Sequence, residues 1–146
     1  IGAEIDIDQE AIELFVLGEH GDTQFPVWST AHIAGKSLSS FCKQDSLDAF
    51  AVEAKERAYE IIECKGATYF GIAQCIVDIC TIILHDQKLI IPLSCYQQQY
   101  EVCVSMPVLL GRKGIEQIVI PSFTREEEKR LIHSVQNIKN KQVACF

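Results

Sequence analysis

The spacing of apolar residues in the first part of the chain predicts two short β segments around a polar loop. Residues 12–17 (IELFVL) form an apolar run that ends at Gly18, a pattern typical of a buried strand. The next segment, residues 19–25, contains two charges, a histidine and a glycine, so we expect a loop there. Residues 26–33 (PVWSTAHI) are again rich in β-forming residues.

The middle of the chain changes to a helical spacing of apolar residues. A first helix is predicted over residues 46–63, where one stripe collects Ala51, Ala54, Ala58, Ile61 and Ile62. Gly66 marks a break, and a second helix is predicted to run to about His85. Its main stripe is Ile72, Ile76, Ile79 and Ile83, and most of its remaining circumference is also apolar. Such a helix is expected to be largely buried, either in the domain or against another subunit.

In the last part of the chain the spacing becomes that of strands and then of a final helix. Residues 89–96, 102–110 and 115–120 are predicted as strands of an antiparallel meander. Thr124, with Glu127 three residues later, forms a capping box. The helix that it starts is expected to turn four residues inward: Leu131, Ile132, Val135 and Ile138. The predicted fold class is α+β, with an antiparallel β-meander packed on long helices.

Composition excludes several classes of partner. The chain has 146 residues, enough for one domain, and a net charge of −7 that disfavours nucleic acid, because an acidic protein repels phosphate backbones. Its apolar runs are shorter than the ~20 residues that a membrane span needs, and no segment has the pattern of a secretion signal. We therefore expect a cytoplasmic protein that binds neither nucleic acid nor membrane.

The cysteines indicate a reducing compartment and no metal. There are seven, an odd number, and they lie in apolar segments, so we expect reduced and mostly buried thiols. No C-x-x-C pair and no zinc-finger spacing of Cys and His occurs, so no metal site is expected. The sequence also contains no glycine-rich loop of the kind that holds nucleotide phosphates.

The densest candidate for chemistry is the segment Gly18-Glu19-His20-Gly21-Asp22. Glycines on both sides of this segment allow a sharp turn and close approach of a ligand. An imidazole titrates near neutral pH and suits proton transfer, provided that a carboxylate orients it. Glu19 and Asp22 are candidates for that carboxylate. On the residues alone, a surface loop with a solvent-exposed histidine is the more frequent interpretation of such a segment.

Longer stretches of the sequence resemble the L-lactate dehydrogenases of the lactate/malate dehydrogenase family. Residues 18–29 (GEHGDTQFPVWS) resemble the active-site stretch of that family, and residues 58–73 (AYEIIECKGATYFGIA) resemble the helix pair that lines its substrate pocket. Residues 107–121 (PVLLGRKGIEQIVIP) resemble its late hairpin, and residues 124–131 (TREEEKRL) resemble the start of its final helix. These stretches occur in the family's order along nearly the whole chain.

The resemblance implies an NAD-dependent oxidoreductase that interconverts pyruvate and L-lactate, as in glycolysis and carboxylic acid metabolism. His20 would be the proton donor and acceptor, Thr68 would line the substrate site, and Ile72 would pack on the nicotinamide. Thr68 and Ile72 are four residues apart on a helix, so both can face one pocket.

The resemblance also bears on domain organisation. Residues 1–146 would be a single C-terminal substrate-binding domain, without the N-terminal domain that holds most of the NAD and supplies the carboxylate-binding arginine and the aspartate that orients the histidine. The start at Ile1 instead of Met agrees with that expectation. The isolated chain is therefore expected to be inactive, and the full-length enzyme to be a tetramer or dimer.

Several alternatives stay open. Malate dehydrogenases share the G-x-H-G-D core, and hydroxyisocaproate dehydrogenase is another relative; Glu19 and the PVWS segment favour the lactate branch. A related glycosidase family with a similar second domain needs a metal held by Cys and His, and that ligand pattern is missing here. A different class of function is a free-standing, non-catalytic domain kept for oligomerisation, in which His20 would have no role.

Overall fold

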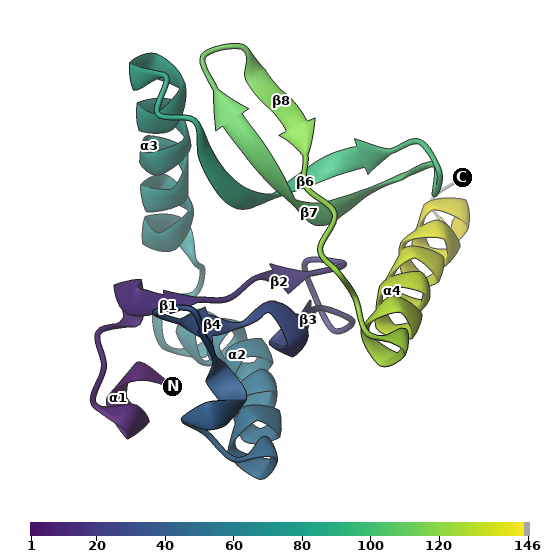
Figure 1. The fold of residues 1–146 in the computed structure, drawn as a ribbon. Coiled ribbons are helices and arrows are strands. Elements are labelled where there is room, and N and C mark those ends of the chain that lie inside the picture. The colour runs from purple at the N-terminus through teal and green to yellow at the C-terminus, as the bar shows by residue number, and fades with distance from the viewer. Residues whose placement is uncertain (145–146) are drawn as a thin grey trace.

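The sheet predicted in the last part of the chain is the largest β element of the computed structural model, which describes residues 1–144 (Figure 1). It contains β6 (Leu89–Gln97), β7 (Val102–Gly111) and β8 (Gly114–Ile118), all antiparallel and in chain order. The pairing of β6 with β7 runs without interruption from Leu89 opposite Leu110 to Gln97 opposite Val102. The predicted meander and the α+β class are therefore confirmed.

The apolar run at residues 12–17 is not one strand, and that prediction was wrong in detail. β1 (Ile12–Glu13) pairs with β4 (His32–Ile33), which in turn pairs with β5 (Lys36–Ser37), whereas β2 (Val16–Leu17) pairs with β3 (Phe25–Pro26). The run divides because its residues pack into two different hydrophobic clusters. Leu14 packs against one cluster, and Phe15 and Leu17 pack in the other.

The predicted β segment at residues 26–33 is also divided. A 3-10 turn, η2 (Trp28–Thr30), separates β3 from β4. Two further 3-10 turns, η1 (Gln9–Ala11) and η3 (Leu38–Ser40), and a four-residue helix, α1 (Gly2–Ile5), complete this part of the chain.

Two hydrophobic cores lie between the sheets and helices of the chain. The larger core lies between the inward face of β7, the β2–β3 pair and the final helix, and includes Leu17, Phe25, Val104, Met106, Leu131 and Val135. The smaller core lies beneath the β1–β4–β5 sheet and is formed by Ala31, Ile33, Leu38, Cys42 and Leu47. The segment between β2 and β3 therefore lies against the larger core, close to the final helix.

The two predicted long helices are present, α2 (Gln44–Lys65) and α3 (Tyr69–His85), and Gly66 ends the first of them as predicted. Burial of α3 within the domain, the first of the two expected arrangements, is wrong, whereas its burial against another subunit stays a prediction. Ile72 and Ile76 of its apolar stripe are 52% and 55% exposed, and only Ile82 on this helix is fully buried. The reason is that α3 contacts β7 along part of its length and stands at the edge of the molecule (Figure 1).

The final helix, α4 (Arg125–Ala144), begins with the predicted capping box. Oγ1 of Thr124 accepts a hydrogen bond from the Glu127 backbone N–H (3.2 Å), and the Glu127 carboxylate accepts one from the Thr124 N–H (2.8 Å). Leu131 and Val135 are buried as expected, but Ile132 is 53% exposed, because it lies one residue around the helix from Leu131, on the solvent side.

The prediction that most cysteines are buried was wrong. Cys42 and Cys95 are buried, whereas four thiols are exposed: Cys64, Cys75, Cys80 and Cys103. Three of the four lie on the uncovered faces of α2 and α3, and Cys103 is on the outward face of β7. Cys145 lies outside the described residues. Within residues 1–144 no helix combines the length and hydropathy of a membrane span.

Candidate functional site

The segment that carries His20 is a loop between β2 and β3, fixed at its start to the main sheet. The backbone of Gly18 exchanges two hydrogen bonds with Ser105 of β7: the Gly18 N–H donates over 3.3 Å and the Gly18 carbonyl accepts over 3.0 Å. The loop closes with a turn in which the Gln24 N–H donates to the Gly21 carbonyl (3.2 Å). His20 therefore sits at the end of a buried strand, as the sequence predicts.

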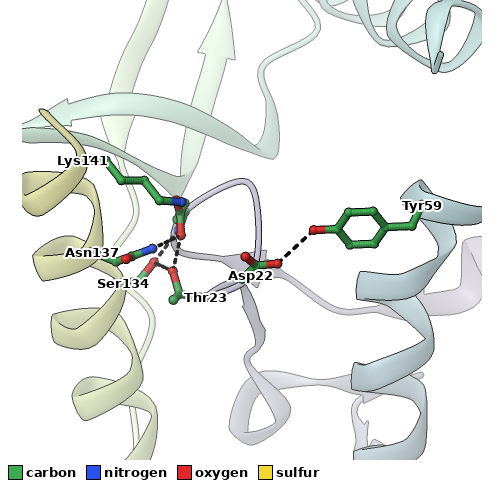
Figure 2. Close-up of polar contacts among 7 residues, drawn as sticks. Asp22, Thr23, Tyr59, Ser134, Asn137 and Lys141 are labelled. Carbon is green, nitrogen blue, oxygen red and sulfur yellow. Dashed lines mark hydrogen bonds and ion pairs between the residues drawn. The ribbon is translucent and has the colours of Figure 1, made fainter. Parts of the chain in front are cut away.

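The carboxylate of Glu19 ties the loop to α4 (Figure 2). It accepts hydrogen bonds from Oγ1 of Thr23 (2.6 Å), Nδ2 of Asn137 (2.6 Å) and Nζ of Lys141 (2.5 Å). Burial by itself raises the pKa of this carboxyl, but these hydrogen bonds and the charge of Lys141 outweigh it and lower the pKa to about 2. Glu19 is therefore ionised at neutral pH.

The carboxylate of Asp22 is directed to the opposite side of the loop. It accepts a 3.0 Å hydrogen bond from the phenolic oxygen of Tyr59 on α2. That bond, together with the negative charge of Asp22, raises the pKa of the Tyr59 hydroxyl. Figure 2 shows the result: the loop lies between α4 and α2, with side chains of both helices reaching it.

The side chain of His20 itself is exposed. It lines a small cavity of about 60 Å³ whose other walls include Gly18, Gln24 and Ser105. Glu19 and Asp22 were candidates to orient the imidazole, but both are bound elsewhere, and no other side chain in the described part of the chain hydrogen-bonds to it. Among residues 1–144 the imidazole is thus left open to solvent and to a ligand.

Thr68 and Ile72 share the first turn of α3. Thr68 is half-buried and occupies the N-cap position of α3 without a capping side-chain hydrogen bond, and its carbonyl accepts a 3.1 Å hydrogen bond from the Ile72 N–H. Ile72 is 52% exposed. Neither residue lines the cavity that His20 lines, and no hydrogen bond among the described residues joins them to His20, so the predicted site residues form two groups.

Sequence reasoning missed the part of the site on α4. Ser134, Asn137 and Lys141 are spaced by three and four residues, so they fall on one face of the helix and meet the loop together. Their signal in the sequence is a polar stripe beside the apolar stripe of Leu131 and Val135, and such a stripe is normally solvated. Within residues 1–144 no group of His, Cys, Asp or Glu is arranged to hold a metal ion.

Comparison with known proteins identifies the family of the chain. The family described as lactate/malate dehydrogenase, alpha/beta C-terminal domain, matches residues 1–145. L-lactate dehydrogenase A of Rhizopus oryzae is 39% identical over 96% of this chain and 44% of its own length. L-lactate dehydrogenase of Lacticaseibacillus casei is 34% identical over 97% of this chain and 47% of its own length. The chain therefore spans about half the length of these curated relatives.

Solved structures agree as well. A lactate dehydrogenase from a Medee basin deep-sea metagenome library superposes with a TM-score of 0.91 at 27% identity, over 95% of this chain and 48% of that one. The malate dehydrogenase of Aeropyrum pernix superposes with a TM-score of 0.89 at 26% identity, over the same shares of the two chains. Since the family model matches residues 1–145, nearly the whole chain, this chain belongs to the lactate/malate dehydrogenase family and corresponds to its α/β C-terminal domain.

Proposed function

We propose that this chain is the substrate-binding half of an NAD-dependent L-lactate dehydrogenase, in which His20 exchanges a proton with the substrate oxygen. The observation that carries the proposal is the G-E-H-G-D loop: it presents an exposed imidazole while both flanking carboxylates are bound to other elements. The similarity to L-lactate dehydrogenases over 96% and 97% of the chain supports it.

The residues present fit one end of a nicotinamide nucleotide. Ile72 offers an exposed apolar side chain next to the half-buried Thr68, which suits a flat ring beside a small polar substrate. The sequence has no glycine-rich loop for the nucleotide's phosphates, so we assign those to a preceding half of the protein. When bound, NADH would supply the hydride for reduction of a 2-keto acid.

The part that this chain plays is proton transfer and placement. A ring N–H of protonated His20 would donate to the carbonyl oxygen as negative charge develops there, and the same nitrogen would accept the proton in the reverse reaction. Thr68 would place its hydroxyl beside the substrate. An exposed imidazole can exchange its proton with solvent between turnovers.

Location and assembly belong to the same proposal. Four exposed thiols that have no disulfide partner within residues 1–144 fit a reducing compartment such as the cytoplasm. The uncovered apolar surface of α3 supports a homo-oligomer.

Malate is the second candidate substrate, favoured by the near-equal superposition of the malate dehydrogenase of Aeropyrum pernix. The test is the rate of NADH oxidation by the full-length protein with pyruvate and with oxaloacetate. We expect kcat/KM to be higher with pyruvate; a higher value with oxaloacetate would assign the malate reaction instead. If the full-length protein turned over neither keto acid, the remaining function would be that of a non-catalytic domain kept for oligomerisation.

The role of His20 is tested in the same assay. His20→Gln is expected to lower kcat by about 10²–10⁴-fold, the usual contribution of a positioned acid–base group. His133→Gln is the matched control, because His133 is an exposed histidine on α4. Near-normal turnover of His20→Gln would exclude His20 as the proton donor. The 146-residue chain by itself is expected to show no turnover.

A further inference from the structure

We infer that the C-terminal helix α4 positions His20, through a hydrogen-bonded clamp on Glu19 made by Ser134, Asn137 and Lys141. The inference rests on the proposed function, since it assigns these residues an effect on the reaction of His20. None of the three is a catalytic residue: each acts through the residue that precedes His20 in the chain.

The first part of the clamp is a closed ring of hydrogen bonds. Oγ of Ser134 accepts from the Glu19 backbone N–H over 2.5 Å and lies 3.0 Å from Oγ1 of Thr23. Oγ1 of Thr23 donates its proton to the Glu19 carboxylate (2.6 Å), so the Ser134 hydroxyl must donate to Thr23. Each hydroxyl in the ring both donates and accepts, which strengthens its neighbours. Ser134 is fully buried, so this ring is shielded from competing water.

The second part of the clamp is ionic. The side chain of Glu19 is 11% exposed, and Lys141 brings a positive charge to its Oε1 over 2.5 Å. Asn137 donates to Oε2. A largely buried carboxylate is costly without such partners. Both the backbone N–H and the carboxylate of Glu19 are therefore fixed to one face of α4.

The clamp determines where His20 lies because the imidazole has no hydrogen bond of its own within residues 1–144. Its place follows from the residues on either side of it. On the amino side, Glu19 is held by α4; on the carboxyl side, Asp22 is held by Tyr59 of α2. Releasing the α4 side would let the loop rotate about its remaining contacts, and a displacement of about 1 Å at a reacting group can cost up to 10²-fold in rate.

Steady-state kinetics of the full-length protein with NADH and its preferred keto acid test this. Lys141→Met and Ser134→Ala are each expected to lower kcat by about tenfold or more with less than a threefold change in KM. Lys141→Arg keeps the charge and should recover most of kcat. Lys139→Met is the matched control, because Lys139 lies on the same helix but pairs with Glu101 of the hairpin turn; it should stay within twofold of wild type.

Hydrogen exchange on the 146-residue chain supplies a readout that does not depend on activity. In Ser134→Ala, the Glu19 amide should exchange at least tenfold faster. The Val27 amide, which donates to the Phe15 carbonyl (2.9 Å), should be unchanged and so report an intact fold. Normal kcat in both Lys141→Met and Ser134→Ala, or unchanged exchange at Glu19, would overturn the inference. If the wild-type protein does not turn over, the proposed function fails, and the exchange result alone decides whether the clamp exists.

Discussion

Gly18 and Ser134 approach each other so closely that a Cβ atom on Gly18 would lie 2.8 Å from Oγ of Ser134. Gly18 also has a φ of +95°, a region that side-chain-bearing residues rarely adopt. The missing side chain is what allows the buried hydroxyl of α4 to reach the backbone N–H of Glu19. A contact between residues at opposite ends of the chain thus depends on the glycine that opens the histidine loop.

Gly18→Ala is therefore expected to destabilise the fold by about 2–4 kcal/mol, because backbone strain and overpacking add. Gly35→Ala is the control: Gly35 also has a positive φ, +76°, but an added Cβ there meets nothing within 4 Å. It should cost only about 1 kcal/mol of strain. Urea denaturation monitored by circular dichroism measures both. If the two variants lost the same free energy of unfolding, the close approach of Ser134 to Gly18 would add nothing to the cost of a side chain at position 18.

Glu19 should make the free energy of unfolding depend on pH in the acidic range. Its pKa is lowered to about 2 in the folded chain, so the folded state binds the proton less readily than the unfolded state. The stabilisation is therefore fully present above pH ~4.5 and is lost as pH falls towards 2, with a total of roughly 2 kcal/mol. The free energy of unfolding of wild type minus that of Glu19→Gln should shrink across this window. A pH-independent difference would contradict the assigned cause.

The contribution of the α4 capping box to stability should be measurable by removing the hydroxyl of Thr124. Oγ1 of Thr124 accepts from the Glu127 N–H, and Glu127 also accepts from the N–H and hydroxyl of Ser29, so the box joins the start of α4 to the η2 turn. Thr124→Ala is expected to cost about 1 kcal/mol, whereas Thr124→Ser, which keeps the hydroxyl, should cost much less. Thermal unfolding compares the two variants. Indistinguishable midpoints would mean that the cap does not contribute.

The isolated chain is expected to self-associate through α3. Phe70 and Leu84 are 82% and 72% exposed, and Ile76 is 55% exposed, so one helix displays a continuous apolar surface. The double substitution Phe70→Lys with Ile76→Lys should shift the chain towards monomer. Ile132→Lys is the control, since Ile132 is an isolated exposed residue of α4, 53% exposed.

Light scattering after size exclusion, across a tenfold dilution series, measures this association. A mass that falls on dilution for wild type, and stays near 16.4 kDa for the double variant, is the expected result. A wild-type chain that is monomeric at every concentration would contradict the prediction, because the apolar surface of α3 would then remain exposed to solvent without causing association.

The sequence predicted the elements whose signals are local. Two-residue periodicity marked the β6–β7–β8 meander, the break at Gly66 separated α2 from α3, and the pair Thr124 and Glu127 located the start of α4. Each signal depends on residues close together in the chain, so propensity and hydrogen bonding within one element suffice to produce it. The resemblance of residues 18–29 singled out His20 in the same way, from a contiguous motif.

Tertiary structure decided the rest. The first half of the run at residues 12–17 packs against the smaller core and the second half against the larger one, and only the positions of those cores divide the run into β1 and β2. The exposure of α3 follows from what packs against it, which its own hydropathy does not encode. The hold of Ser134, Asn137 and Lys141 on Glu19 joins residues more than a hundred positions apart. Pairings over such separations form only when the whole chain has folded, and the same serine or lysine on another helix would be an ordinary solvated side chain.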